Sequence, residues 1–384
     1  MMINPKYIRI YIILVLSLIL TILLLGAVSC KNFRLVQQVL KVLSFIGYTI
    51  AMLQTVLYKS HIRQIVWFRY SLMSFIIMLA FYSLFSNHFK MIFPVMSSLL
   101  AFYFFYYYTL KGYLGESIYM YFIIVYFFVC AFLFYDIMAY RFTYLTTFDE
   151  GGGINTGYNI LGFLVLALVY HKKTFVFLLS TLAFIMILFC MKRGAVVCGT
   201  VIYLFMFVKY LKNSPIKSVW KLYIIWGFVT LVIMCVLINN QGLFHRFDMQ
   251  ELRSGSGRNS IYFTILNNYW KQESIWGVLF GNGFFAVTDM YFPGYGIHKE
   301  GFYAHSDFYE VIWDHGAFGL FLYASILFSL FSFFMHSINY KYLMWAFIIS
   351  FLIRAYVSGV YTLIDGQVEF ALIGYLMGQN EKGE

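Results

Sequence analysis

Charged residues are scarce in this sequence. Lysine and arginine together number 27 and aspartate and glutamate 16, so that only 11% of the 384 residues are charged. A soluble domain has about a quarter of its residues charged. So few ionisable groups could not cover the surface of a soluble protein of this length, which excludes that class. Disorder is excluded as well, because disordered chains have low hydrophobicity and this sequence is 62% hydrophobic.

Proline and cysteine are also rare. The four prolines and the lack of a low-complexity tract exclude a string of domains joined by flexible linkers. The five cysteines lie within or at the end of apolar runs, without partners in polar loops, so we expect neither a disulfide framework nor a zinc site. The sequence has no phosphate-binding P-loop, which argues against ATP-driven work.

Long apolar segments take up most of the chain. Windows of spanning length recur with polar residues between them and predict an all-α polytopic integral membrane protein with about twelve transmembrane helices. The run from Ile10 to Val28 is long for a cleaved signal peptide and is expected to be the first spanning helix. The predicted spans are 7–28, 35–57, 66–85, 91–110, 117–138, 155–170, 174–190, 194–211, 220–239, 310–335, 342–358 and 362–378.

One connection between predicted spans is much longer than the others. It divides the chain into residues 1–239 with the first nine helices, a large periplasmic loop at 240–304, and residues 305–384 with the last three helices. Lysine and arginine in the short loops gather on the side that holds both chain ends. By the positive-inside rule we expect cytoplasmic N- and C-termini and an outward-facing long loop.

Several arginines oppose this bias by falling on the outer side. Guanidinium groups at a membrane surface are costly unless they meet anions, and they bind phosphate oxygens in bidentate fashion. A lipid-linked diphosphate is therefore the ligand class that they predict. Snorkelling toward outer-leaflet lipid phosphates explains any single one equally well. These residues are Arg193, Arg246, Arg253, Arg258 and Arg354.

The long loop ends in the densest polar cluster of the chain. If this segment enters the membrane as a helix, Asp307, Glu310 and Asp314 share one face. Their carboxylates either complement the helix dipole or take part in a reaction. His305 lies beside them at the aqueous boundary, where an imidazole can accept or release a proton. A metal site that includes His315 is an alternative, although its spacing is unlike that of zinc sites.

Three short motifs occur together in the second half of the chain. The pair Arg193-Gly194 opens a predicted helix on the outer side. The segment 256–258 reads Ser-Gly-Arg early in the long loop and is followed by Gly-Asn-Gly at 281–283. His305-Ser306 is followed after nine residues by Gly-Ala-Phe-Gly at 316–319. Together these motifs resemble those of the bacterial O-antigen polymerase and O-antigen ligase superfamily. The ligase pattern continues with Thr or Val where this chain has Leu320, so the motifs leave polymerase and ligase unresolved.

The resemblance implies a GT-C-like glycosyltransferase architecture and a definite activity. Members of the superfamily transfer a saccharide from an undecaprenyl-diphosphate carrier at the periplasmic face of the bacterial inner membrane. This implies a membrane enzyme of lipopolysaccharide O-antigen biosynthesis that needs no cofactor, metal or nucleic acid. Its implied partners are undecaprenyl-diphosphate-linked glycans, membrane lipids, and the flippase and chain-length regulator of the same pathway.

The resemblance also implies roles for individual residues. His305 is expected to act as general base or to orient the acceptor hydroxyl, and Glu310 or Asp307 to orient His305. The arginines expected to bind the diphosphate are Arg193, Arg258, Arg253 and Arg354.

Polymerase is favoured over ligase on overall resemblance, and a capsule or exopolysaccharide polymerase would share the chemistry. A transporter is the alternative from another class. It would carry ionisable residues at mid-membrane depth, whereas Asp136 and Arg354 lie near the ends of their predicted spans.

Overall fold

The computed structural model describes residues 5–27, 34–144, 156–170, 173–190, 192–213, 227, 258–292, 304–337, 340, 343–361 and 366–383. Every regular element in these ranges is a helix. Seven helices are long and apolar enough to cross a membrane, as judged by length and composition. A helical membrane protein is therefore supported, while the full count of twelve spans stays a prediction. The seven helices are α1 (Pro5–Ala27), α2 (Arg34–Val56), α3 (Arg63–Ser83), α4 (Ile92–Leu110), α5 (Glu116–Tyr144), α8 (Arg193–Asn213) and α14 (Asp307–His336).

Four other predicted spans coincide with shorter helices, of 12 to 17 residues. Of the predicted span at 220–239, only residue 227 is described. The long loop contains helices of its own, which hydropathy did not predict: α12 (Arg258–Trp270), α13 (Ile275–Phe280) and the 3-10 turn η5 (Ala286–Asp289). The four shorter helices are α6 (Thr156–Ala167), α7 (Thr174–Cys190), α15 (Met344–Val357) and α16 (Gln367–Gly383).

Contacts divide the chain into two compact units. Unit 1 comprises Met1–Leu40 and Leu114–Met249, and unit 2 comprises Lys41–Tyr113 and Gln250–Glu384. In unit 1, α6 is the core helix: its side chains are buried, apart from that of Asn159, among α5, α7 and α8. The described cysteines, Cys130, Cys190 and Cys198, are buried in this unit, and none of them is in a disulfide.

The core of unit 2 is α4, a helix without a charged residue, in which nearly every side chain is buried. Helix α16 packs along it. A methyl group at Gly374 would overlap the carbonyl oxygen of Phe102, and one at Gly378 would lie 2.7 Å from that of Tyr106. Glycines four residues apart let two helix backbones approach closely, which is a common device in membranes. The Gly374–Gly378 pair therefore fixes where α16 crosses α4.

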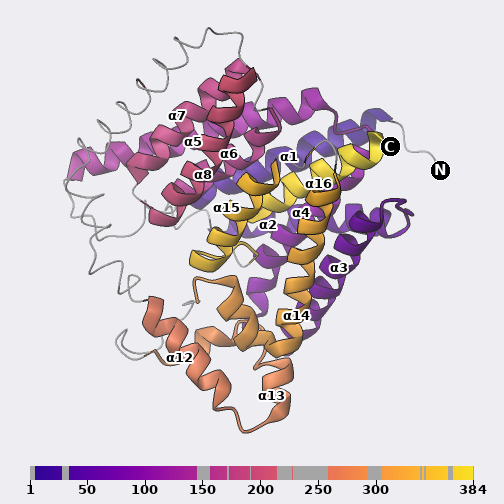
Figure 1. The fold of residues 1–384 in the computed structure, drawn as a ribbon, viewed down its shortest axis with the longest axis vertical. Coiled ribbons are helices and arrows are strands. Elements are labelled where there is room, and N and C mark those ends of the chain that lie inside the picture. The colour runs from indigo at the N-terminus through magenta and orange to yellow at the C-terminus, as the bar shows by residue number, and fades with distance from the viewer. Residues whose placement is uncertain are drawn as a thin grey trace. The chain divides into compact units, whose positions relative to one another are not determined.

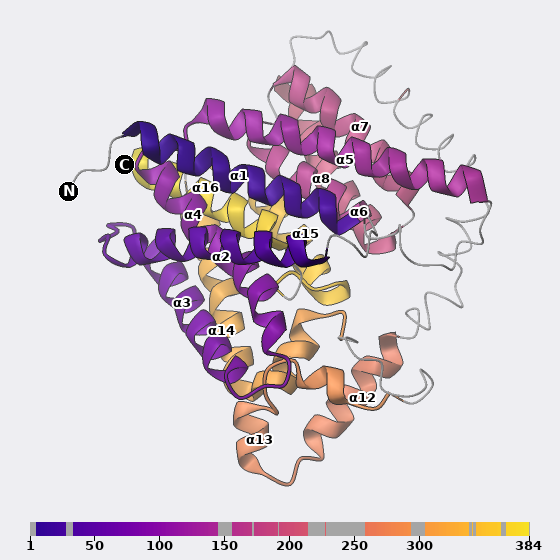
Figure 2. The same cartoon turned by 180° about the vertical axis from the view of Figure 1, so that it is seen from behind.

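Helix α14 runs beside α3 in unit 2, as both views show (Figures 1 and 2). Gly316 interrupts α14 with φ 64° and ψ −161°, which separates its first turns from the longer apolar part. The loop helices α12 and α13 pack against α14. A small core joins α12 and α14 to η5 and the residues around it, formed by Ile261, Tyr262, Ile265, Val287, Phe292 and Ala304. This arrangement brings the long loop to the beginning of α14.

Candidate functional site

Three buried carboxylates occupy the first turns of α14. The helix begins at Asp307, which confirms that the segment is helical. Asp307, Glu310 and Asp314 are at most 1% exposed. A carboxylate at such depth is costly unless its oxygens accept hydrogen bonds. Each of the three accepts them from a different loop, so together they hold three separate pieces of chain against α14.

Asp307 holds the loop between α15 and α16. Its carboxylate accepts hydrogen bonds from the backbone N–H of Val360 at 2.9 Å and of Tyr361 at 3.4 Å. The hydroxyl of Tyr323, further along α14, donates to Oδ2 at 2.7 Å. The rings of Tyr323 and Tyr361 also pack on Phe75 of α3. Asp307 is therefore anchored on two sides, by Tyr323 of its own helix and by the loop before α16.

Glu310 holds the turn that carries His305. Its Oε2 accepts a hydrogen bond from the backbone N–H of Ala304 at 2.7 Å, and the Tyr262 hydroxyl donates to the carbonyl of His305 at 3.4 Å. His305 has φ 56°, a left-handed conformation that costs energy for a residue with a side chain. Glu310 thus acts on the backbone beside His305, which is consistent with a positioning role.

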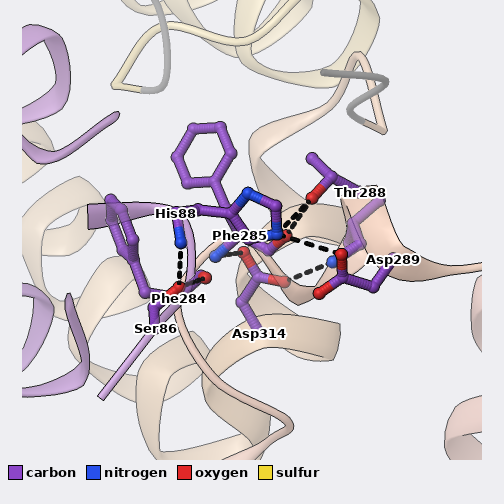
Figure 3. Close-up of polar contacts among 8 residues, drawn as sticks. Ser86, His88, Phe284, Phe285, Thr288, Asp289 and Asp314 are labelled. Atoms are coloured by element: carbon purple, nitrogen blue, oxygen red, sulfur yellow. Dashed lines mark hydrogen bonds and ion pairs between the residues drawn. The ribbon is translucent and has the colours of Figure 1, made fainter. Parts of the chain in front are cut away.

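Asp314 holds the loop that follows α13. Its Oδ2 accepts a hydrogen bond from the backbone N–H of Phe285 at 2.9 Å, and its Oδ1 accepts one from Val287 at 3.0 Å (Figure 3). Phe285 has φ 60°, the second left-handed residue other than glycine in the described chain. Both strained residues therefore lie next to loops fixed by the carboxylates of α14.

The two glycine motifs meet at a backbone crossing. The N–H of Gly283 donates to the carbonyl of Asp314 at 2.9 Å, and that of Asn282 to Trp313 at 3.1 Å. A methyl group at Gly281 would overlap the backbone of Asp314, and one at Gly316 would lie 2.6 Å from the carbonyl of Leu279. The Gly-x-Gly and Gly-x-x-Gly motifs, distant in sequence, therefore allow one close contact between the long loop and α14.

The chain after α3 closes the same loop from another side. Ser86 Oγ donates to the carbonyl of Phe284 at 2.7 Å. His88 Nε2 lies 3.0 Å from Asp289 Oδ1 and 3.0 Å from Thr288 Oγ1 (Figure 3). Sequence reasoning missed this contribution. The connection between the predicted spans 66–85 and 91–110 lies on the same predicted side of the membrane as the long loop, and this could have indicated a contact between them.

Arg258 and Arg354 adjoin one segment, the end of α15 and the residues after it. Arg258 is the first residue of α12, and its Nη1 donates to the carbonyl of Val357. Among the described residues its guanidinium makes no other hydrogen bond, so most of its five N–H donors remain for a ligand. Arg354 is 1% exposed and forms a buried ion pair with Glu369 of α16. Its predicted contact with a diphosphate stays a prediction.

The other two predicted arginines lie elsewhere. Arg193 opens α8, as its pairing with Gly194 predicted, and is half-buried in unit 1. Arg253 lies outside the described residues, as does Arg246. The motif residues that the structure brings together are thus Arg258, the glycine pairs and the His305 turn, all in unit 2.

Acidic side chains outnumber basic ones among the described buried residues of this site. Asp307, Glu310, Asp314 and Glu369 are buried, and so is Arg354, which pairs with Glu369. Burial raises the pKa of Tyr361 well above its ordinary value, and the carboxylates of Glu310, Asp314 and Asp307 raise it further. In the described ranges no three His, Cys, Asp or Glu side chains are arranged to hold a metal ion, which does not support the alternative metal site at His305 and His315.

Comparison with known proteins does not assign this chain to a family. No family model matches the sequence, and no curated protein matches it significantly. The geometry of the site and the motifs within it are therefore the basis for a functional proposal.

Proposed function

We propose that this chain is a membrane glycosyltransferase, an O-antigen polymerase that joins undecaprenyl-diphosphate-linked oligosaccharide repeat units at the periplasmic face of the inner membrane. The single observation that carries the proposal is the convergence of Arg258, His305 and the two glycine motifs around the start of α14. Arg258 and Tyr262 of α12 both bond the end of α15, and Tyr262 also bonds the backbone of His305.

The proposed reaction needs one base and one anion-binding group. The acceptor hydroxyl oxygen attacks the anomeric carbon of the donor sugar, and the bond from that carbon to the diphosphate oxygen breaks. His305 accepts the hydroxyl proton. The N–H groups of Arg258 that Val357 does not use bind the departing diphosphate and stabilise its charge. In this scheme Glu310 positions His305 through the backbone of Ala304.

Arg193, Arg253 and Arg354 complete the proposed set of diphosphate ligands. Arg193 belongs to it through its sequence motif, and Arg253 through its place two residues before the loop glycines. Arg354 forms an ion pair with Glu369, so in this proposal it acts on the diphosphate through its charge while that ion pair stays intact. We therefore expect Arg258 to be more sensitive to substitution by lysine than Arg354, because only a guanidinium fork binds phosphate in bidentate fashion.

Polymer ladders in cells that depend on this chain test the proposal. His305→Ala should lower turnover by about 10²- to 10⁴-fold, the usual effect of removing a general base, and leave protein levels normal. His336→Ala is the matched control, because His336 lies at the other end of α14 and is exposed. Normal ladders from His305→Ala would rule out the assigned base.

A second assay separates polymerase from ligase. Purified protein is incubated with a lipid-linked donor and with either a lipid-linked repeat unit or lipid A-core as acceptor. Extension of the lipid-linked oligomer supports the polymerase, whereas transfer to lipid A-core alone would replace it with the ligase. Transfer to neither acceptor by an active preparation, with transport of a solute across vesicles instead, would favour the transporter.

A further inference from the structure

A groove of about 560 Å³ lies along α12 of unit 2. Figure 1 shows where this helix lies in the described part of the long loop. This volume falls within the range of about 300–1,000 Å³ that is usual for small-molecule sites. Its described lining combines hydroxyl, amide and aromatic side chains, and none of these described residues is charged. The lining residues are Ser260, Phe263, Thr264, Asn267, Asn268 and Tyr291.

The buried face of α12 does not include Phe263, Thr264, Asn267 or Asn268. Helix α12 packs on unit 2 with its other face, where Ile261, Ile265 and Tyr269 are buried. In contrast, Phe263 is 72% exposed and Tyr291 is 55% exposed. Large aromatic surfaces gain free energy when they leave water, so two of them beside one groove indicate a surface that meets a ligand.

The polar groups of the groove have the chemistry of sugar recognition. The amides of Asn267 and Asn268 can each donate and accept, and they make no side-chain hydrogen bond within the described residues. The hydroxyl of Thr264 donates to the carbonyl of Ser260 at 2.8 Å and keeps its lone pairs for a donor. A sugar hydroxyl needs such donors and acceptors, and the apolar C–H face of a sugar ring packs on an aromatic ring.

We propose that this groove binds uncharged sugar residues of an oligosaccharide. An acidic glycan would lose solvation there without meeting a cation among the described lining residues, none of which is charged. The groove begins at Ser260, two residues after Arg258, and reaches Asn268, a length of about 12 Å along a helix. A saccharide whose diphosphate lies at Arg258 would thus extend along α12. This last placement rests on the proposed function, whereas sugar binding itself does not.

Direct binding tests the groove on the full chain in nanodiscs of phosphatidylethanolamine and phosphatidylglycerol. Maltoside detergents are avoided, because their sugar headgroups would compete. The neutral probes are hexasaccharides of glucose, galactose, mannose, rhamnose or N-acetylglucosamine, and the acidic probe is hexagalacturonate. Binding is detected by saturation-transfer NMR. We expect at least one neutral hexasaccharide to bind and hexagalacturonate to bind more weakly.

Variants locate the bound sugar. Asn267→Ala and Phe263→Ala should each weaken binding by about tenfold, the effect expected for the loss of one good contact. Trp276→Ala is the matched control, because this exposed aromatic of α13 does not line the groove, and it should bind as the wild type does. Equal loss in the control, unchanged binding in both groove variants, or binding of hexagalacturonate alone would each overturn the proposal.

Failure of the proposed function gives a different result. His305→Ala should keep hexasaccharide binding and lose polymer ladders, whereas the double variant Phe263→Ala/Asn267→Ala should lose binding. Normal ladders in His305→Ala together with intact hexasaccharide binding would refute the assigned base and leave the groove standing. Absence of neutral hexasaccharide binding in the wild type would refute the groove even if ladders form.

Discussion

Removal of the Asp314 carboxylate should loosen the part of the loop at 285–287 that it holds against α14. The carboxylate is 1% exposed and accepts hydrogen bonds from the backbone N–H groups of Phe285 and Val287. Asp314→Ala leaves both buried donors without this acceptor. Each unsatisfied buried donor costs about 1–3 kcal/mol, so the variant should lose about 2–6 kcal/mol of unfolding free energy. Asp314→Asn keeps one acceptor oxygen and should lose about half as much.

Titration of the solubilised protein with SDS, followed by tryptophan fluorescence, measures this loss. Asp289→Asn is the matched control in the same loop, because the Asp289 side chain is 66% exposed where it pairs with His88. Exposed ion pairs contribute about 0–1 kcal/mol, so the control should unfold almost as the wild type does. If Asp314→Ala and Asp289→Asn unfold alike, the carboxylate does not hold the loop.

Two further predictions concern the packing of α16. Gly374→Ala should destabilise the protein by about 1–3 kcal/mol or more, because the added methyl group overlaps the backbone of Phe102. Gly383→Ala is the control and should not destabilise it, because the space around Gly383 is open. Thermal unfolding followed by size-exclusion chromatography compares the two variants. Glu369→Gln should cost about 3–5 kcal/mol, because it leaves Arg354 as a buried charge. The apolar pair Arg354→Met/Glu369→Leu should recover most of that loss in the same SDS titration, and a double variant as unstable as Glu369→Gln would contradict the reasoning.

Two residues of the site have strained backbone conformations, and hydrogen bonds to carboxylates of α14 hold the chain at or beside both. His305 and Phe285 both have left-handed backbones, and a carboxylate of α14 bonds each loop at or beside the strained residue. Such conformations persist only where the surrounding structure holds them, and they cluster at functional sites. The strain at His305 is therefore an independent reason, besides its motif, to place this residue at the centre of the proposed reaction.

Much of the secondary structure was predictable from local pattern. Apolar run length predicted α1 to α5, α7 and α8 to within a few residues at most ends, because a helix in a membrane must satisfy its own backbone and so follows hydropathy. The shared face of Asp307, Glu310 and Asp314 followed from helical spacing in the same way. Hydropathy did not predict α12 and α13, because both are short helices in a loop that is polar on average.

The tertiary contacts were beyond local pattern. Gly281 lies against α14, and Arg354 pairs with Glu369, because segments distant in the sequence pack together. The spacing of residues along the chain does not tell which distant segments will pack. The motif resemblance led us to expect that Arg258 and His305 act together. It gave no sign that the Tyr262 hydroxyl contacts the carbonyls of both His305 and Tyr356.

Scarcity of charge, visible in the sequence, is sufficient to predict a helical membrane protein, because apolar helices are what such a chain can form. The role of the acidic residues in α14 is visible only in the folded chain. Their partners are backbone N–H groups, which every residue except proline carries. No residue type marks such a partner in advance, so three carboxylates that look alike in sequence came to hold three different loops only when the chain folded.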